Sequence, residues 1–281
     1  MSTDTGLNAS PETGVSAAQP APLRFDANLK WLFTEVPFLE RFDAAAKAGF
    51  TAVEYAAPYS YDPADLKRRL ADAGLKQVLV NTPMGEPGTP TRSGVACFPD
   101  RVQEFRDGVD QGLEYATALG ADFLHIVGGI RPDGVSRDRA FARYVTNIAW
   151  AADRSQGTGV RLVLEAMNKR DAPGFILDTQ AQAAAVAEAV GSENVGLLFD
   201  FYHAQIDEGD LLTTLDNVWD RVFHLQIADT PSRHEPGTGE IAYTRIFDHL
   251  RRRGYQGWIG CEYAPAAGTV EGLDWIKEAS A

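Results

Sequence analysis

Residues 222–240 read Val-Phe-His-Leu-Gln-Ile-Ala-Asp-Thr-Pro-Ser-Arg-His-Glu-Pro-Gly-Thr-Gly-Glu, which places a strand, its polar end and a loop in one short stretch. The apolar run over 222–228 is typical of a buried strand, and the glycines and prolines after it are typical of a loop. An amphipathic segment over 244–253 and another apolar run over 258–262 come next. This order predicts a strand–helix–strand unit, whose strands pair in parallel through a right-handed crossover.

The same alternation is found along the whole chain from Leu23 onward. Strands are predicted over 23–29, 52–56, 77–81, 123–127, 161–166, 195–201, 222–228 and 258–262. Helices are predicted over 37–48, 63–73, 101–119, 137–154, 179–190, 210–218, 244–253 and 270–278. Glycines stand where five of these helices should end, at positions 49, 74, 120, 191 and 254.

Eight such units favour an α/β fold in which one domain forms a closed (β/α)8 barrel over residues 23–281. The alternative of an open, doubly wound sheet is weakened because no GxGxxG follows the first strand. The alternative of two domains needs a linker, and none is visible after residue 23. Residues 1–22 lack the positive start and apolar core of a signal peptide, and we interpret them as a disordered N-terminal tail.

The composition argues against several classes of protein. Lys and Arg total 26 against 39 Asp and Glu, so the formal net charge of −13 repels phosphate backbones, and we expect no nucleic-acid partner. No apolar run approaches the roughly eighteen residues that span a bilayer, so we expect no membrane partner. Cys97 and Cys261 form no CxxC pair, which argues against a disulfide framework or a thiolate zinc site and favours a cytoplasmic location.

Polar side chains recur at the ends of the predicted strands, where the catalytic residues of such barrels lie. They are Glu54, Asn81, His125, Glu165, Asp200, Gln226 and Glu262. The last four come from consecutive strands. Burying three carboxylates costs several kcal/mol each unless a cation compensates them, and an oxygen-only ligand set favours Mg²⁺ or Mn²⁺. The alternative for any one carboxylate is a helix cap or an arginine partner.

The histidines divide into two groups. His203 follows Asp200 by three positions at the barrel mouth and is a candidate for substrate contact, as is Asn81 at the end of the third strand. His125 and His224 precede further apolar residues on their strands, so we expect both to be buried and hydrogen-bonded. The loop over 82–99, which leaves the end of the third strand, is expected to be either surface decoration or a lid over the mouth.

Several segments resemble hydroxypyruvate isomerase, within the wider group of xylose isomerase-like barrels. They are Phe25-Asp-Ala-Asn-Leu, Glu104-Phe-Arg-Asp-Gly-Val, His224-Leu-Gln-Ile-Ala-Asp, Glu235-Pro-Gly-Thr-Gly-Glu-Ile and Gly257-Trp-Ile-Gly-Cys-Glu-Tyr. The resemblance implies a divalent metal held by Glu165, Asp200, Gln226 and Glu262, with the two glutamates also moving protons. In the related sugar epimerases the third ligand is usually histidine, so Gln226 places the chain in the hydroxypyruvate isomerase branch.

The resemblance also implies how substrate is bound. The related sugar epimerases contact substrate through a His three positions after the metal-binding Asp and an Arg after the third ligand, and His203 and Arg233 match these two residues. Asp171 is the nearest match to an acidic residue that follows the first glutamate ligand, and it is one carbon shorter than the usual glutamate. A small hydroxy-keto acid needs a cation for its carboxylate, for which Arg233 is the first candidate and Lys169 or Arg170 the second.

The predicted reaction interconverts hydroxypyruvate and tartronate semialdehyde through an enediolate. The alternatives are a 2-oxo-tetronate isomerase, a ketose 3-epimerase, a zinc endonuclease, or a barrel that binds a metabolite without catalysis. The sequence leaves open whether the chain forms a homo-oligomer.

Overall fold

A computed structural model describes residues 22–279, and its eight strands form a closed parallel barrel in the order β1 to β8. The strands are β1 (Arg24–Asn28), β2 (Ala52–Tyr55), β3 (Lys76–Asn81), β4 (Phe123–His125), β5 (Arg161–Glu165), β6 (Val195–Asp200), β7 (Val222–Ile227) and β8 (Trp258–Cys261). β8 pairs with β1 and closes the barrel. The predicted (β/α)8 barrel is therefore confirmed, whereas the tail over 1–22 lies outside the described residues except for its last position.

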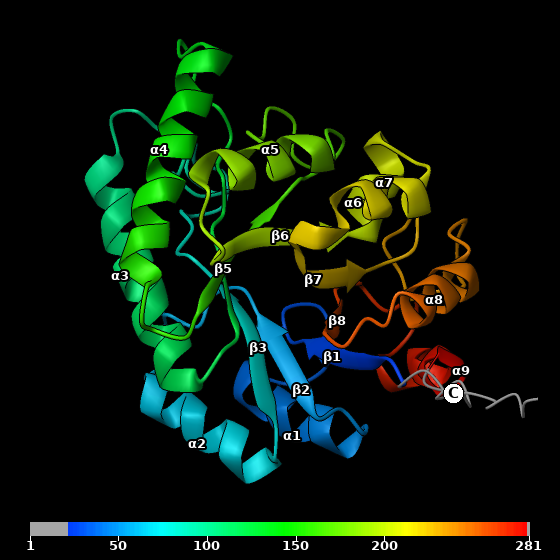
Figure 1. Cartoon of the computed structure of the whole chain (residues 1–281). Helices are drawn as coiled ribbons and strands as arrows, with labels where there is room; N and C mark the ends of the chain where they lie inside the picture. Colours follow the sequence, from blue (N-terminus) through cyan, green and yellow to red (C-terminus); the bar gives the residue numbers. More distant parts are fainter. Residues whose placement is uncertain (1–21, 280–281) are drawn as a thin grey trace, which may run out of the picture.

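Helices surround the strands on the outside (Figure 1). They are α1 (Arg41–Lys47), α2 (Pro63–Ala73), α3 (Val102–Leu119), α4 (Arg137–Ser155), α5 (Gln180–Val190), α6 (Phe201–Asp207), α7 (Leu211–Val218), α8 (Tyr243–Arg252) and α9 (Asp274–Ala279). The short 3-10 turns are η1 (Phe38–Glu40), η2 (Trp219–Arg221) and η3 (Val270–Leu273). The five glycines predicted to end helices all have positive φ.

Helix α6 was not predicted. The sixth strand was expected to run to residue 201, but it ends at Asp200, and Phe201 begins α6. The reason is local, because Asp200 Oδ1 accepts a 2.7 Å hydrogen bond from the backbone N–H of Tyr202 and caps the new helix. The apolar Phe201 and Tyr202 extend the strand pattern in sequence, yet they are buried on a helix.

Two separate cores hold the barrel together. The larger one lies between the strands and the helices, and a smaller one fills the barrel itself. The smaller core consists of Ala52, Val78, Leu79, Phe123, Val163 and Leu198, with Phe223 and Trp258 against it. Because side chains alternate along a strand, the residues two positions beyond Val163 and Leu198 also face the interior. These are Glu165 and Asp200, so the packing of β5 and β6 aims both carboxylates into the barrel.

The loop over 82–99 is only partly a surface feature. Residues 95–98 are buried, and the loop is tied to the barrel by a 3.0 Å hydrogen bond from Cys97 N–H to the Gly128 carbonyl. The Asn147 amide of α4 donates a further bond, of 2.8 Å, to the Ala96 carbonyl. The second half of the loop is therefore packed core, contrary to the expectation of a surface segment.

Candidate active site

The predicted metal ligands meet at the C-terminal end of the barrel. Glu165, Asp200 and Glu262, together with His203, present ligand atoms that all lie within 4.8 Å of one another. Glu165 ends β5, Asp200 ends β6, and Glu262 directly follows β8. Gln226 of β7 is in register with Asp200 on one side and with Gly260 on the other, so the parallel pairing brings its side chain to the same level.

Several polar atoms of this cluster are buried without a hydrogen-bond partner among the described residues. They are Glu165 Oε1, Asp200 Oδ2 and Gln226 Oε1. Leaving such an atom unpaired costs about 1–3 kcal/mol, and more when it is charged. Three unpaired oxygens from three neighbouring strands fit a hard divalent cation such as Mg²⁺ or Mn²⁺, which binds carboxylate and amide oxygens. The donor set of this chain is therefore suited to such an ion.

The raised pKa values of Glu165 and Asp200 also fit a site that binds a cation. Burial, and then the charges of Glu262 and Asp200, raise the pKa of Glu165 well above its usual range. Burial raises the pKa of Asp200 to about 7, although the guanidinium of Arg233 opposes that shift. Like charges this close resist ionising together, and a bound cation would favour their ionised forms.

His203 is held as a neutral hydrogen-bond donor. Its Nδ1 accepts a 3.2 Å hydrogen bond from the backbone N–H of Asn168, which leaves the proton on Nε2. Burial, followed by the charge of Arg233, lowers the pKa of His203 well below its usual range. Nε2 lies 3.6 Å from Asp200 Oδ2 and 3.7 Å from Glu165 Oε1. Although His203 lies within the ligand cluster, its Nε2 therefore offers an N–H rather than a metal-binding lone pair.

Arg233 reaches the cluster from the loop after β7. Its guanidinium lies 4.7 Å from the ring centres of both Trp31 and Tyr202, and it contacts Glu262 and approaches Asp200. The aromatic contacts hold the guanidinium in place at the mouth. From the sequence, a strand-end carboxylate could also cap a helix or pair with an arginine. Both contacts occur here in addition to the carboxylate cluster, because Asp200 caps α6 and Glu262 pairs with Arg233.

The loop that carries Arg233 is folded around Asp229. The two oxygens of this carboxylate accept four backbone hydrogen bonds of 2.9–3.0 Å. The donors are Thr230, Gly237, Gly239 and Ile241. Glu240 adds one bond, of 3.1 Å, from the Thr230 hydroxyl. Asp229 and Glu240 therefore order the loop, and His234 is bound to the Ala264 carbonyl at its edge.

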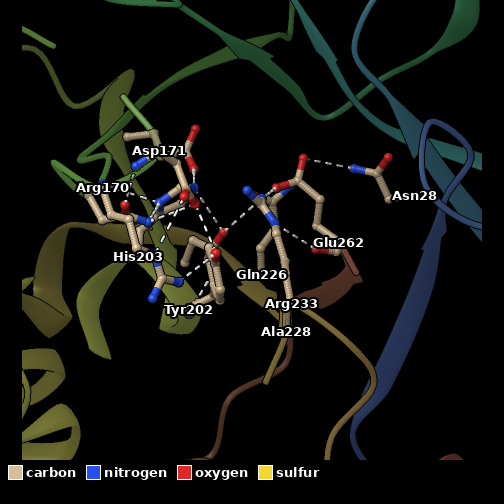
Figure 2. A network of polar contacts seen from close by, with 12 residues as sticks. Asn28, Arg170, Asp171, Tyr202, His203, Gln226, Ala228, Arg233 and Glu262 are labelled. Atoms are coloured by element: carbon tan, nitrogen blue, oxygen red, sulfur yellow. Dashed lines mark hydrogen bonds and ion pairs between the residues drawn. The ribbon is translucent and has the colours of Figure 1, made fainter. Parts of the chain in front are cut away.

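Asp171 lies on the opposite side of the site from Glu262 (Figure 2). Its Oδ2 accepts hydrogen bonds from the Tyr202 hydroxyl at 2.8 Å and from the Asn168 amide at 3.1 Å. Although partial burial raises the pKa of Asp171, these hydrogen bonds bring it below its usual value. Arg170 donates to the same Tyr202 hydroxyl, whereas Lys169 lies 3.4 Å from Asp207 and is engaged away from the cluster.

Two further strand-end residues lie on neighbouring strands. Asn81 of β3 is in register with His125 of β4, and its backbone carbonyl accepts a hydrogen bond from Tyr59. His125 is buried as predicted, with its Nε2 3.5 Å from Glu165 Oε2. The expectation that it is fully hydrogen-bonded is wrong, because this Nε2 has no hydrogen-bond partner among residues 22–279.

A second polar layer lies beneath the ligands and was not predicted. His224 is buried as predicted, and its Nε2 lies 2.7 Å from Glu54 Oε2, but its Nδ1 has no hydrogen-bond partner among the described residues, so its ring is only half hydrogen-bonded. Glu54 also accepts hydrogen bonds from Gln226 and Asn28. Glu54 stands at the end of a predicted strand, as the proposed ligands do. Only the three-dimensional structure shows which residues it contacts.

The chain matches known proteins over most of its length. Residues 42–279 match the family described as xylose isomerase-like TIM barrel. A 2-oxo-tetronate isomerase of Pectobacterium atrosepticum is 43% identical over 254 residues, covering 90% of this chain and 97% of the relative. The hydroxypyruvate isomerase of Escherichia coli is also 43% identical over 254 residues, covering 90% of this chain and 98% of the relative.

A solved structure supports the same grouping. A Brucella melitensis protein described as AP endonuclease, family 2, has a TM-score of 0.88 and 41% identity, covering 92% of this chain and 100% of that one. The resemblance found in the sequence motifs is thus confirmed over nearly the whole described chain. The protein belongs to the hydroxypyruvate isomerase family of xylose isomerase-like TIM barrels and is an isomerase.

Proposed function

We propose that the protein is a metal-dependent isomerase that interconverts hydroxypyruvate and tartronate semialdehyde. Glu165, Asp200, Gln226 and Glu262 would hold one Mg²⁺ or Mn²⁺. The observation that carries this proposal is the set of buried, unpartnered oxygens on three of these residues, at the mouth of a barrel whose relatives are named isomerases. When bound, the divalent ion supplies Lewis acidity toward the substrate carbonyl.

The proton transfers fall to the two glutamates. In hydroxypyruvate a proton leaves C3 and one returns to C2, while the hydroxyl proton moves from O3 to O2, so that atoms and charge balance. Glu165 ends β5 and Glu262 directly follows β8, and their carboxylates lie within 4.8 Å of each other at the barrel mouth. A carboxylate placed at the reacting carbon can take up the proton as a general base and return it as a general acid.

Substrate binding and orientation fall to the residues around the cluster. Arg233 would bind the substrate carboxylate, because its guanidinium forms paired hydrogen bonds with such a group. The Nε2–H of neutral His203 would donate to the oxygen on which negative charge develops. Asp171 and Asn81 would contact the hydroxyl group of the substrate. The contacts of His203, Arg233 and Asp171 beside the cluster support their roles, and Asn81 is proposed from its place at the end of β3.

A 2-oxo-tetronate isomerase is the second candidate, and three relatives at 42–43% identity carry that name. The two substrates share a carboxylate and an adjacent ketone and differ by one carbon unit. Ketose 3-epimerization is less well supported, because Gln226 stands where the related sugar epimerases usually have a histidine ligand. A zinc endonuclease needs a cluster of histidines and a basic face, whereas His203 is the one histidine in the ligand cluster of the described residues and the chain carries a charge of −13.

The test is a side-by-side assay of hydroxypyruvate, 2-oxo-tetronate and free ketoses, with Mg²⁺, with Mn²⁺ and after chelation with EDTA. We expect metal-dependent turnover of hydroxypyruvate with the highest kcat/KM. A higher kcat/KM for 2-oxo-tetronate would favour the second candidate. Turnover of ketoses alone, or turnover that survives EDTA, would contradict the proposal.

Within residues 22–279 we find no helix with the length and apolar character that a bilayer crossing requires.

A further inference from the structure

A buried carboxylate without an assigned role lies directly beneath the proposed ligands. Glu54, at the C-terminal end of β2, is fully buried and accepts three hydrogen bonds from two other strands, β1 and β7. Its Oε1 accepts from Gln226 Nε2 at 2.6 Å and from Asn28 Nδ2 at 2.8 Å, and its Oε2 lies 2.7 Å from His224 Nε2. The pairing of Glu54 with Gln226 crosses the barrel interior, from β2 to β7.

This pairing determines which end of the Gln226 amide is free. An ionised carboxylate only accepts hydrogen bonds, so the group of Gln226 that faces Glu54 must be its NH₂. The carbonyl Oε1 is then directed away from Glu54, and it is buried without a partner. A glutamine that flipped by half a turn would offer NH₂, which cannot bind a cation. Glu54 thus selects the one amide orientation that is useful to a metal.

A longer hydrogen bond links Glu54, through Asn28, to Glu262, a second proposed metal ligand. The Asn28 amide that donates to Glu54 also lies 3.3 Å from Glu262 Oε1, and Figure 2 shows Asn28 reaching Glu262 from the side of β1. Asn28 is itself held in this orientation, because its Oδ1 accepts a 3.1 Å hydrogen bond from the backbone N–H of Lys30. Its NH₂ therefore faces both carboxylates.

The barrel leaves a defined space for the Glu54 side chain. Gly260 of β8 lies against it, and a Cβ at position 260 would lie 2.5 Å from Glu54 Oε1 and 2.8 Å from its Cδ. Such distances are shorter than carbon contacts allow, so any larger residue at 260 would displace the carboxylate. The glycine contributes no hydrogen bond of its own and is needed here for space.

Another interpretation is that this layer is a second cation site. Asp26, Glu54 and His224 present ligand atoms within 4.8 Å of one another, and both oxygens of Asp26 are buried without a partner. However, Glu54 and His224 are already joined directly, which uses the lone pairs and the space that an ion between them would need. The direct hydrogen bonds favour a role in orientation.

We propose that Glu54 is a positioning residue that fixes the Gln226 amide, with its carbonyl oxygen toward the metal, and steadies Glu262 through Asn28. This inference rests on the proposed function, since it assumes that Gln226 is a metal ligand. Outer-layer partners of metal ligands typically change metal affinity by about 10–100-fold when they are removed.

The experiment measures Mn²⁺ binding directly, by electron paramagnetic resonance of free Mn²⁺ and by calorimetry, on the full chain. We expect one Mn²⁺ per chain in the wild type, and a 10–100-fold higher Kd in Glu54→Met, which has similar length but no acceptor. Glu54→Gln retains one acceptor oxygen for Gln226, so it should recover most of the affinity. Gly260→Ala should weaken binding in the same direction as Glu54→Met, whereas Gly108→Ala, at a position with room for a Cβ, should leave the Kd unchanged.

A double-mutant cycle separates positioning from general damage. In a Gln226→Ala background, Glu54→Met should raise the Kd less than about threefold further, because the amide that it orients is gone. Equal effects of Glu54→Met in both backgrounds, or an unchanged Kd in Glu54→Met, would overturn the proposal. If Glu54→Met does not fold, Gly260→Ala in the wild-type and Gln226→Ala backgrounds gives the same comparison. Two Mn²⁺ ions per chain would show the lower layer to be a cation site, which also overturns it. A wild type that binds no Mn²⁺ would instead contradict the proposed function itself.

Discussion

Arg233 Nη2 lies 3.6 Å from Asp200 Oδ2 and also contacts Glu262 Oε2, so one guanidinium reaches two of the proposed metal ligands. It supplies positive charge next to carboxyl groups that burial would otherwise leave uncompensated. A cation bound between the same carboxylates would take over that role, and the guanidinium would then be available to the carboxylate of the substrate. Arg233 thus connects the charge of the site to the choice of substrate.

Arg233→Lys should raise KM for hydroxypyruvate and lower kcat/KM by roughly 10–100-fold, because lysine keeps the charge but loses the paired donors and the stacking on Trp31 and Tyr202. Steady-state kinetics checks this. Arg245→Lys, on the exposed side of α8, is the matched control and should leave both constants unchanged. Unaltered KM in Arg233→Lys would exclude a direct contact with the carboxylate.

Glu165→Gln and Glu262→Gln should each lower kcat by at least about a thousandfold, since each removes a group that moves a proton and weakens the metal site. The measurement is turnover together with circular dichroism, which should show both variants folded. A barrel that only binds a metabolite would show no turnover in the wild type to lose. Full activity in either variant would remove that glutamate from the proposed mechanism.

Metal binding should depend on pH through Asp200. Burial raises its folded pKa to about 7, above its usual value, so this group stabilises the metal-free fold at low pH, and that contribution is lost as pH rises through about 7. We therefore expect the Tm of metal-free protein to fall between about pH 4 and 7, and the Tm increase caused by Mn²⁺ to grow over the same range. Thermal unfolding with and without Mn²⁺ measures both trends.

Asp200→Asn is the control for this pH dependence, because the amide does not titrate. In this variant the decline in metal-free Tm should be shallower than in the wild type. The same slope in both proteins would assign the pH dependence to other groups.

Truncating a side chain of the small core inside the barrel should lower the free energy of unfolding strongly. Leu198→Ala removes a fully buried side chain that packs among residues of neighbouring strands, so it should lower the free energy of unfolding by roughly 2–5 kcal/mol. Urea denaturation measures this loss. Val270→Ala, where the side chain is 65% exposed, should stay within about 0.5 kcal/mol of the wild type.

The sequence predicted the barrel because two local signals recur along it: the strand–helix alternation eight times and the helix-ending glycine five times. It missed α6 because Phe201 and Tyr202 continue an apolar strand pattern, and only the cap at Asp200 shows that the strand stops. The ligand set followed from one rule about strand ends. By contrast, the role of Glu54 and the tautomer of His203 depend on partners that are distant in sequence, such as Gln226 for Glu54 and Asn168 for His203, and no spacing in one sequence reveals those pairings.

We propose that Glu165, Asp200, Gln226 and Glu262 together hold one divalent metal at the barrel mouth. Anomalous diffraction at the manganese absorption edge, from a crystal soaked with Mn²⁺ and hydroxypyruvate, would locate this metal. We expect a single strong peak bounded by oxygens of these four side chains, with the substrate carboxylate on Arg233. A peak away from the four side chains, or one that lacks Gln226 as a neighbour, would contradict it.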